Sequence, residues 1–297
     1  MIKFMVFGDL HYDELPDGDR RVDELLTHIK QTKPQFVVSL GDLCRPVQRN
    51  KEAVLEKFSA AGVTLYHMLG NHETDACHLE NALEFLSLKS PYYSFQYGNV
   101  KFIVLNSCYL RKDGKEEPYY SRNYKEEAVL YPVIPSDEIE WLKKELNDGK
   151  QYVIFSHHSL INQFGDRGIY NREEIRSLFE GKNVRLCMNG HDHGDDFSVV
   201  EGILYYTVNS AAYVWCGSQI ASSESLREKY GYLNGFLFYK QALYVDVEMD
   251  DNEIRISGMN GEYLSVAPEN IGLYDYRWNG VSIEAKTSSC VINRNGT

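Results

Sequence analysis

Residues 63–73 read Val-Thr-Leu-Tyr-His-Met-Leu-Gly-Asn-His-Glu, an apolar run that ends in an amide, an imidazole and a carboxylate. The run has the length of a buried strand, and Gly70 marks its end. Polar side chains placed there would lie at the open edge of a sheet, where α/β proteins carry their chemistry. The same residues also fit a helix N-terminus, with Asn71 as the cap and Glu73 favoured by the helix dipole.

The same pattern recurs at four other places in the chain. Strand-like apolar runs also end at four sets of polar residues, which are Asp9 with His11, Asp42, His157, and His191 with His193. Helical patterns separate most of these runs, as expected for parallel strands joined by crossover helices. Because the carboxyl ends of parallel strands lie at one edge of a sheet, we expect these side chains to converge on a single rim.

The residue types on this rim are those that bind metal ions. Alternate residues of an extended segment share a face, so Asp9 and His11, or His191 and His193, can each direct two side chains to one ion. The predicted ligands are Asp9, His11, Asp42, Asn71, His157, His191 and His193. Carboxylate, amide and imidazole ligands without thiolate favour Mn, Fe, Zn, Co or Ni. Seven ligands exceed what one ion needs, so we predict two ions about 3.5 to 4 Å apart.

The remaining chain predicts one domain over residues 1–297. Residues 1–196 form the half with the metal site, alternating runs predict an antiparallel half over 197–258, and 259–297 form a C-terminal extension. Residues 93–97 and 100–105 flank Gly98-Asn99 and predict a hairpin. Residues 109–135 show no period and predict a long surface loop, which serves either the substrate side or packing alone.

Composition excludes several classes of protein. A net charge of −12 lacks the basic footprint that nucleic-acid backbones require, so we expect no general nucleic-acid binding. No apolar run approaches the roughly 18 to 20 residues of a membrane span, and the chain starts directly in a strand-like run without a signal peptide. We therefore expect a cytoplasmic protein. The six scattered cysteines support neither a disulfide framework nor a zinc ribbon.

The order of the motifs resembles the calcineurin-like metallophosphoesterase superfamily. The motifs are Asp9-Leu10-His11, Gly41-Asp42, Gly70-Asn71-His72-Glu73, Ser156-His157 and Gly190-His191-Asp192-His193. Within the superfamily the pattern is most similar to the class III cyclic-nucleotide phosphodiesterase branch. The resemblance implies an α/β fold, a four-layer α/β/β/α sandwich of two mixed sheets flanked by helices.

The resemblance also implies a role for each motif residue. Asp9, His11 and His193 would hold one ion, Asn71, His157 and His191 the other, and Asp42 would bridge them. A hydroxide between the ions would attack phosphorus in line. His72 would contact the phosphate, as Asn71 also would, and protonate the departing oxygen, with Glu73 as the residue that orients its imidazole.

Two residues lie outside the shared pattern. Many relatives carry an acidic residue three places after the bridging aspartate, and purple acid phosphatases carry a metal-binding tyrosine there, but this chain has Arg45. A tyrosinate-iron centre is therefore not implied. Arg45 is either a contact for substrate phosphate or a solvated surface arginine, and His158 is either a substrate contact or a packed side chain.

These patterns predict a dinuclear metal-dependent phosphohydrolase, a phosphodiesterase acting on a small phosphodiester or nucleotide. The alternatives are a phosphomonoesterase or protein phosphatase, and a non-catalytic scaffold that keeps the fold for partner binding. Specificity is expected to lie in residues 109–135 and in the segment from Tyr213 to Tyr230.

Overall fold

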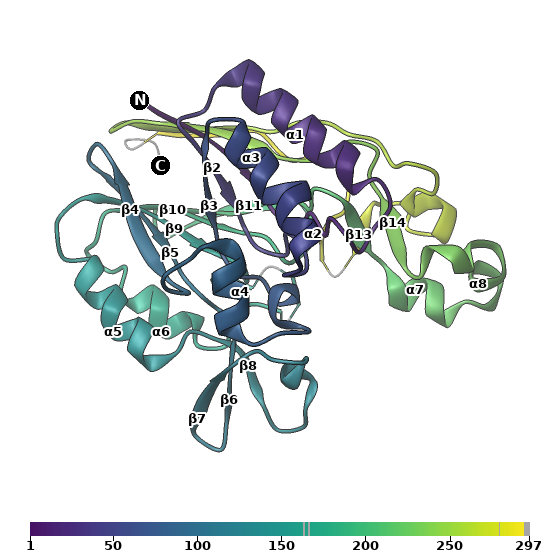
Figure 1. The fold of residues 1–297 in the computed structure, drawn as a ribbon, viewed down its shortest axis with the longest axis horizontal. Coiled ribbons are helices and arrows are strands. Elements are labelled where there is room, and N and C mark those ends of the chain that lie inside the picture. Colours follow the sequence, from purple (N-terminus) through teal and green to yellow (C-terminus); the bar gives the residue numbers. More distant parts are fainter. Residues whose placement is uncertain (163, 166, 279, 294–297) are drawn as a thin grey trace.

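Two six-stranded sheets form the centre of the molecule (Figure 1). The computed structural model describes residues 1–162, 164–165, 167–278 and 280–293. The first sheet has the strand order β19-β16-β15-β1-β2-β3, and the second has the order β11-β12-β10-β9-β5-β4. The first sheet therefore combines strands from the first and the last third of the chain, and the second sheet is built mainly from its middle. In neither sheet does the order of the strands follow the order of the sequence throughout.

The first sheet combines three parallel strands with three antiparallel ones. Its strands are β1 (Ile2–Phe7), β2 (Phe36–Ser39), β3 (Thr64–His67), β15 (Val245–Met249), β16 (Glu253–Ser257) and β19 (Cys290–Asn293). β1, β2 and β3 run parallel, whereas β15 pairs antiparallel with β1 and continues to β16 and β19. The carboxyl ends of β1 to β3 therefore lie at one edge.

The second sheet has a parallel centre and antiparallel edges. Its strands are β4 (Tyr93–Tyr97), β5 (Val100–Val104), β9 (Gln151–Ser156), β10 (Val184–Asn189), β11 (Asp196–Val200) and β12 (Ile203–Thr207). β5, β9, β10 and β12 run parallel, and β4 and β11 pair antiparallel at the two edges. The predicted hairpin around Gly98-Asn99 is confirmed as β4 and β5.

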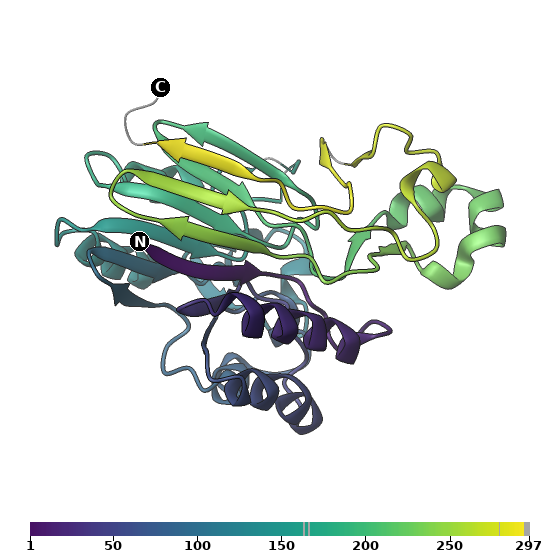
Figure 2. The same ribbon diagram turned by 90° about the horizontal axis from the view of Figure 1, so that it is seen from above.

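Helices cover the outer face of each sheet, which produces four layers (Figures 1 and 2). The helices on the first sheet are α1 (Gly18–Thr32), α2 (Gln48–Asn50), a π-helical turn (Lys51–Glu56), α3 (Lys57–Ala60) and α4 (Leu79–Leu86). Those on the second are α5 (Ser136–Glu145) and α6 (Arg172–Ser177). The predicted α/β/β/α sandwich of two mixed sheets is confirmed.

Alternation along β1 shows how the strands serve two cores. Phe4 and Val6 point between the sheets, where Phe4 packs edge to face on Phe102 of β5 with ring centroids 5.5 Å apart. Met5 and Phe7 point the other way, into the core beneath α1 and α3. Because both faces of the strand are buried, its sequence is continuously apolar rather than alternating.

Residues 109–135 are not the loop that their irregular sequence predicted. They form a three-stranded sheet of β6 (Tyr109–Lys112), β7 (Lys115–Pro118) and β8 (Leu130–Val133), with a short 3₁₀ helix over Asn123–Lys125. Asp113 and Gly114 connect β6 to β7 with positive φ at both positions. Asp-Gly is the preferred dipeptide of such two-residue hairpins, so the sequence did contain a signal.

The last hundred residues extend both sheets instead of forming a separate half. β11 and β12 complete the second sheet, whereas β15, β16 and β19 complete the first. Between them, β13 (Tyr213–Trp215) and β14 (Phe236–Phe238) pair beside α7 (Gly217–Ser222), α8 (Glu224–Tyr230) and the 3₁₀ turn Gly231–Leu233. The turn Pro268–Ile271 and the short hairpin of β17 (Arg277–Trp278) and β18 (Val281–Ser282) follow. The single domain over 1–297 stays a prediction.

Candidate metal centre

The predicted ligands meet where the carboxyl ends of the two sheets face each other. β1, β2 and β3 of the first sheet lead into Asp9 with His11, Asp42 and Asn71, and β9 and β10 of the second lead into His157 and into His191 with His193. We expected these side chains to lie along the rim of one sheet, and the number of sheets in that expectation is wrong. The rim has two sides, because β1–β3 and β9–β10 belong to different sheets.

One group consists of Asp9, His11 and His193, all of them buried. The His193 Nε2 atom lies 3.3 Å from Asp9 Oδ1 and 3.4 Å from His11 Nε2. Two ligands that each lie about 2.1 Å from one ion are separated by about 3.0 to 3.4 Å, depending on the angle between them. The spacing of these donors therefore fits a single transition-metal ion.

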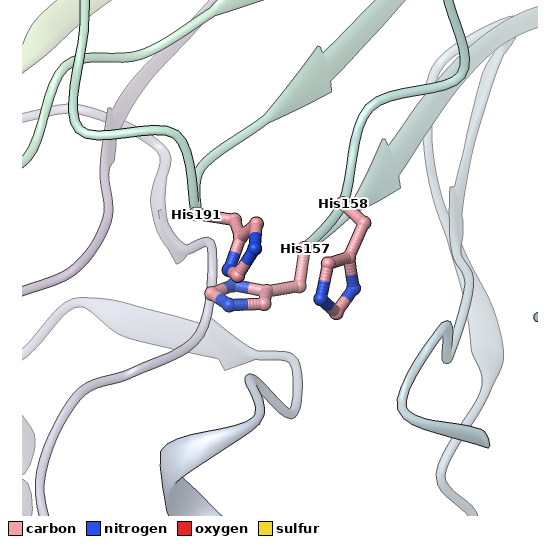
Figure 3. Close-up of side chains that lie close together, drawn as sticks. All are labelled: His157, His158 and His191. Atoms are coloured by element: carbon pink, nitrogen blue, oxygen red, sulfur yellow. The ribbon is translucent and has the colours of Figure 1, made fainter. Parts of the chain in front are cut away.

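A second group surrounds His157 (Figure 3). Its Nε2 atom lies 3.2 Å from Asn71 Oδ1, and its ring centroid lies 5.0 Å from that of His191. Figure 3 shows the rings of His157, His158 and His191 gathered at the ends of two neighbouring strands. Amide oxygen and imidazole nitrogen are again suitable donors for an ion of the same kind.

Asp42 lies between the two groups. Its Oδ2 atom is 3.7 Å from His11 Nε2 and 3.5 Å from His157 Nε2. Burial alone would raise the pKa of this carboxyl, but the nearby imidazoles of His157, His72 and His11 outweigh it and hold the pKa well below its usual value. Asp42 is therefore an ionised carboxylate within reach of both groups, as a bridging ligand must be.

Backbone carbonyls determine which ring nitrogen faces the centre. Nδ1 of His157 donates to the carbonyl of Leu40 at 2.7 Å, and Nδ1 of His193 donates to the carbonyl of Tyr213 at 2.9 Å. A carbonyl can only accept, so each Nδ1 carries a proton and each Nε2 is the nitrogen that faces the other donors of its group. Such hydrogen bonds orient metal-binding histidines and set their tautomer.

Two glycines make room for the carboxylates. A Cβ atom on Gly70 would lie 2.2 Å from Asp42 Oδ1, and one on Gly190 would lie 2.6 Å from Asp9 Oδ2. Asp42 itself has φ 52°, a left-handed conformation that is uncommon outside glycine. Unusual backbone at residues with polar side chains is typical of functional sites.

Glu73 does not orient His72, so this part of the prediction is wrong. Its carboxylate accepts hydrogen bonds from the backbone N–H groups of Asp42, Leu43 and Gly70 at 3.0, 2.6 and 2.7 Å. It therefore ties the loop after β2 to the loop after β3. Burial and the nearby Asp42 raise the pKa of Glu73 to about 7, against the backbone hydrogen bonds that favour the charged form.

His72 stands beside the centre with its side chain 28% exposed. Its Nε2 atom is 3.9 Å from Asp42 Oδ2, while its Nδ1 atom is 3.4 Å from Glu14 Oε2 and 3.3 Å from Asp75 Oδ2. Burial would lower the pKa of this imidazole, but the carboxylates of Asp42, Glu14 and Asp75 outweigh burial and raise the pKa to about 10. His72 is therefore a protonated imidazolium at neutral pH.

A cavity of about 700 Å³ opens over these residues. Arg45, half exposed, and the buried His158 both line it, as do His72 and Asn71. The guanidinium of Arg45 pairs with Glu14, and Nδ1 of His158 lies 2.8 Å from the Ser107 hydroxyl. Both positions are compatible with substrate contact, which stays a prediction for each.

The sequence of this site matches a known family. Residues 2–195 match the model of the calcineurin-like phosphoesterases, a span that contains every predicted ligand. The chain belongs to the calcineurin-like phosphoesterase family. This is a family of metallophosphoesterases, which are enzymes that hydrolyse phosphoric esters.

Two relatives of this phosphoesterase carry the name serine/threonine-protein phosphatase CPPED1. The chain is 27% identical over 187 residues to the protein of Mus musculus and 26% identical over 187 residues to that of Rattus norvegicus. Each match covers 54% of this chain and 54% of the relative. The chain thus spans about half the length of both relatives.

Solved structures with the same fold include a dimetal phosphatase from Danio rerio. It has a TM-score of 0.62 and 15% sequence identity, and the match covers 89% of this chain and 98% of that one. A second structure, described as GAP50, the anchor in the inner membrane complex of Plasmodium, has a TM-score of 0.55 and 14% identity, with 97% and 96% covered. At these identities the likeness shows the fold. In this phosphoesterase no described helix is long and apolar enough to cross a bilayer.

Sequence reasoning gave no individual role to several residues that the phosphoesterase fold brings to the cavity. Aromatic and cationic side chains line its walls, namely Tyr119, Arg122, Tyr124, Lys125, Tyr131, Arg167, Tyr213, Trp215 and Phe236. Five of them lie in residues 109–135 and two in the segment from Tyr213, where specificity was expected. Glu14 and Asp75 carried no local signal, because they reach His72 from two different loops.

Proposed function

We propose that this chain hydrolyses a small phosphodiester or nucleotide with the help of two metal ions. Asp9, His11 and His193 would hold the first ion, Asn71, His157 and His191 the second, and Asp42 both. The observation that carries the proposal is the Asp42 carboxylate between two groups of donors, with His72 beside it and its Nε2 only 3.9 Å from Asp42 Oδ2.

The residues of the chain supply positioning and a proton. The ions, when bound, supply Lewis-acid activation of water and of the phosphoryl oxygens. His72, whose pKa is raised to about 10, holds a proton at neutral pH that it can give to the departing oxygen. Arg45 and His158 line the same cavity and would contact the substrate. The donor set suits Mn, Fe, Zn, Co or Ni.

A second candidate is a phosphomonoesterase or protein phosphatase. It is favoured by the name of the CPPED1 relatives, which are serine/threonine-protein phosphatases. Hydrolysis of bis(p-nitrophenyl) phosphate and of p-nitrophenyl phosphate, compared in Mn²⁺, decides between the two. A clear preference for the diester supports our proposal, and a clear preference for the monoester or for a phosphopeptide contradicts it.

A panel of cyclic nucleotides, nucleotide diphosphate derivatives and glycerophosphodiesters then narrows the substrate. A protein without bound metal, and inactive with every ester after addition of Mn²⁺, would instead be a non-catalytic scaffold. Two further expectations belong here, a cytoplasmic location and a single domain over 1–297. Cell fractionation tests the first, and a single cooperative unfolding transition tests the second.

A further inference from the structure

Glu14 contacts two imidazoles with one oxygen atom. It lies in the loop between β1 and α1, and its side chain is 20% exposed. Its Oε2 atom is 3.4 Å from Nδ1 of His72 and 3.3 Å from Nδ1 of His11. The two rings pack edge to face, with centroids 4.8 Å apart, so a single carboxylate spans both.

Glu14 lies on the Nδ1 side of both rings. Because Glu14 faces the two Nδ1 atoms, both Nε2 atoms point to Asp42 Oδ2, at 3.7 Å for His11 and 3.9 Å for His72. For His11 this leaves Nε2 as the nitrogen toward Asp9 and His193. For His72 it presents the Nε2 proton to the side where the leaving oxygen would be.

Arg45 holds the other oxygen of the same carboxylate. Its Nη2 and Nε atoms donate to Glu14 Oε1 at 3.2 and 3.3 Å, and its backbone N–H donates to Asp13 Oδ1 at 3.0 Å. The two oxygens thus have separate partners, because two N–H groups of the guanidinium converge on Oε1 while the two imidazoles lie against Oε2. Rotation of the Glu14 carboxylate away from either imidazole would break its hydrogen bonds with Arg45.

Asp75 offers a natural comparison. Its Oδ2 atom is 3.3 Å from His72 Nδ1, but the same carboxylate pairs with Arg122 at 2.9 Å and accepts from the Tyr124 hydroxyl at 3.1 Å. Asp75 therefore contacts the proposed acid only, whereas Glu14 contacts both the acid and a proposed metal ligand.

We propose that Glu14 is a positioning residue that couples the two halves of the site, orienting His72 for proton donation and His11 for metal binding. The part of the proposal that concerns His72 rests on the function proposed above. The part that concerns His11 is independent of catalysis, because it predicts a change in metal affinity alone.

The test compares Glu14→Gln, Asp75→Asn and the control Asp17→Asn, which removes a carboxylate from the same loop that pairs with Arg20 at the surface. Metal-free protein is titrated with Mn²⁺ by calorimetry. Substrates with a good leaving group, such as bis(p-nitrophenyl) phosphate, are compared with alkyl diesters, which need protonation of the departing oxygen. Circular dichroism verifies the fold of every variant.

We expect Glu14→Gln to weaken Mn²⁺ binding on the order of 10-fold to 100-fold, as loss of a partner behind a metal ligand does. It should also slow hydrolysis of the alkyl diester by about 10²-fold, but that of the activated diester by much less. Asp75→Asn should show the leaving-group effect without the change in Mn²⁺ affinity, and Asp17→Asn neither. In a His72→Ala background, Glu14→Gln should lose its leaving-group effect.

An equal loss on both diesters, or a Glu14→Gln protein with unchanged Mn²⁺ affinity, overturns the coupling. If the wild type hydrolyses none of the esters, the proposed function fails, yet the Mn²⁺ titration still decides whether Glu14 supports His11. If Asp75→Asn weakens Mn²⁺ binding as much as Glu14→Gln does, the effect comes from the loops in general and the proposal for Glu14 is wrong.

Discussion

The two sheets contribute different chemistry to the same centre. The first sheet brings the oxygen donors Asp9, Asp42 and Asn71, and its loops also carry Glu14 and Asp75. The second sheet brings imidazoles, from His157, His158, His191 and His193, with Arg167 beside them. One side of the centre therefore holds most of the carboxylates, together with His11 and His72, and the other holds mainly imidazoles and Arg167.

The histidines of the second sheet differ in the direction of their pKa shifts. His157 faces Asp42, which outweighs the effect of burial and raises its pKa to about 9. Burial lowers the pKa of His191 and of His193. A buried imidazole with a low pKa stays neutral and keeps the lone pair that a metal ion needs. The carboxylates would attract the ions, and the imidazoles of His191 and His193 would complete their coordination.

The largest effect is expected from Asp42→Asn, which removes the charge shared by the two sides. Loss of a common ligand should release at least one ion and reduce kcat/KM on the order of 10³-fold, equivalent to several kcal/mol of charge stabilisation. Metal content by mass spectrometry and kinetics with bis(p-nitrophenyl) phosphate measure both. Retention of two ions with activity within 10-fold of wild type would contradict the bridging position.

His72→Ala should come next, because it removes the proposed acid without removing a ligand. Activity should fall at least about 10²-fold while two ions remain bound, since His72 lies outside both groups of donors. Steady-state kinetics and metal analysis of the same preparation provide the measurement. Full activity in this variant would show that another group donates the proton.

His191→Ala should have a smaller effect, because it removes a neutral donor from the second side. We expect the affinity for one ion to fall by more than the roughly 10-fold to 100-fold that loss of a partner behind a metal ligand costs, with the other ion retained. Titration of metal-free protein with Mn²⁺ should then resolve one strong and one weak site. If His191→Ala lowers metal binding as much as Asp42→Asn does, the two sides of the centre contribute equally to metal affinity and the comparison between them fails.

The smallest effect is expected at His67, a histidine whose pKa is shifted by burial alone and not by a nearby carboxylate. It ends β3, is buried, and its pKa is lowered to about 4 by burial. Between pH 6.5 and 4 the unfolded chain binds a proton that the folded chain excludes. The free energy of unfolding should therefore fall as pH falls through this range, by up to about 3 kcal/mol.

Urea unfolding of metal-free wild type and His67→Gln at several pH values isolates this contribution. The other histidines titrate in both proteins, so they cancel in the difference. Wild type should lose about 3 kcal/mol more than the variant between pH 6.5 and pH 4, and the activity at neutral pH should be unchanged. Parallel pH profiles would show that His67 titrates normally in the folded chain.

Much of the site was predictable because its residues follow a repeated local pattern. Each of the five runs before Asp9, Asp42, Asn71, His157 and His191 is apolar and short, and each ends in a polar residue. Parallel strands bring such ends together whatever lies between them. The assignment of individual ions to these residues stays a prediction.

The sequence by itself therefore determined the class of fold, the family and the set of candidate ligands. The tertiary structure alone decided that the rim has two sides from different sheets, that Glu73 ties two loops together, and that Glu14 and Asp75 are the partners of His72. These features depend on contacts between loops that are distant in the chain. Periodicity and motif spacing record how a segment folds locally, but they do not record which loop another loop will meet.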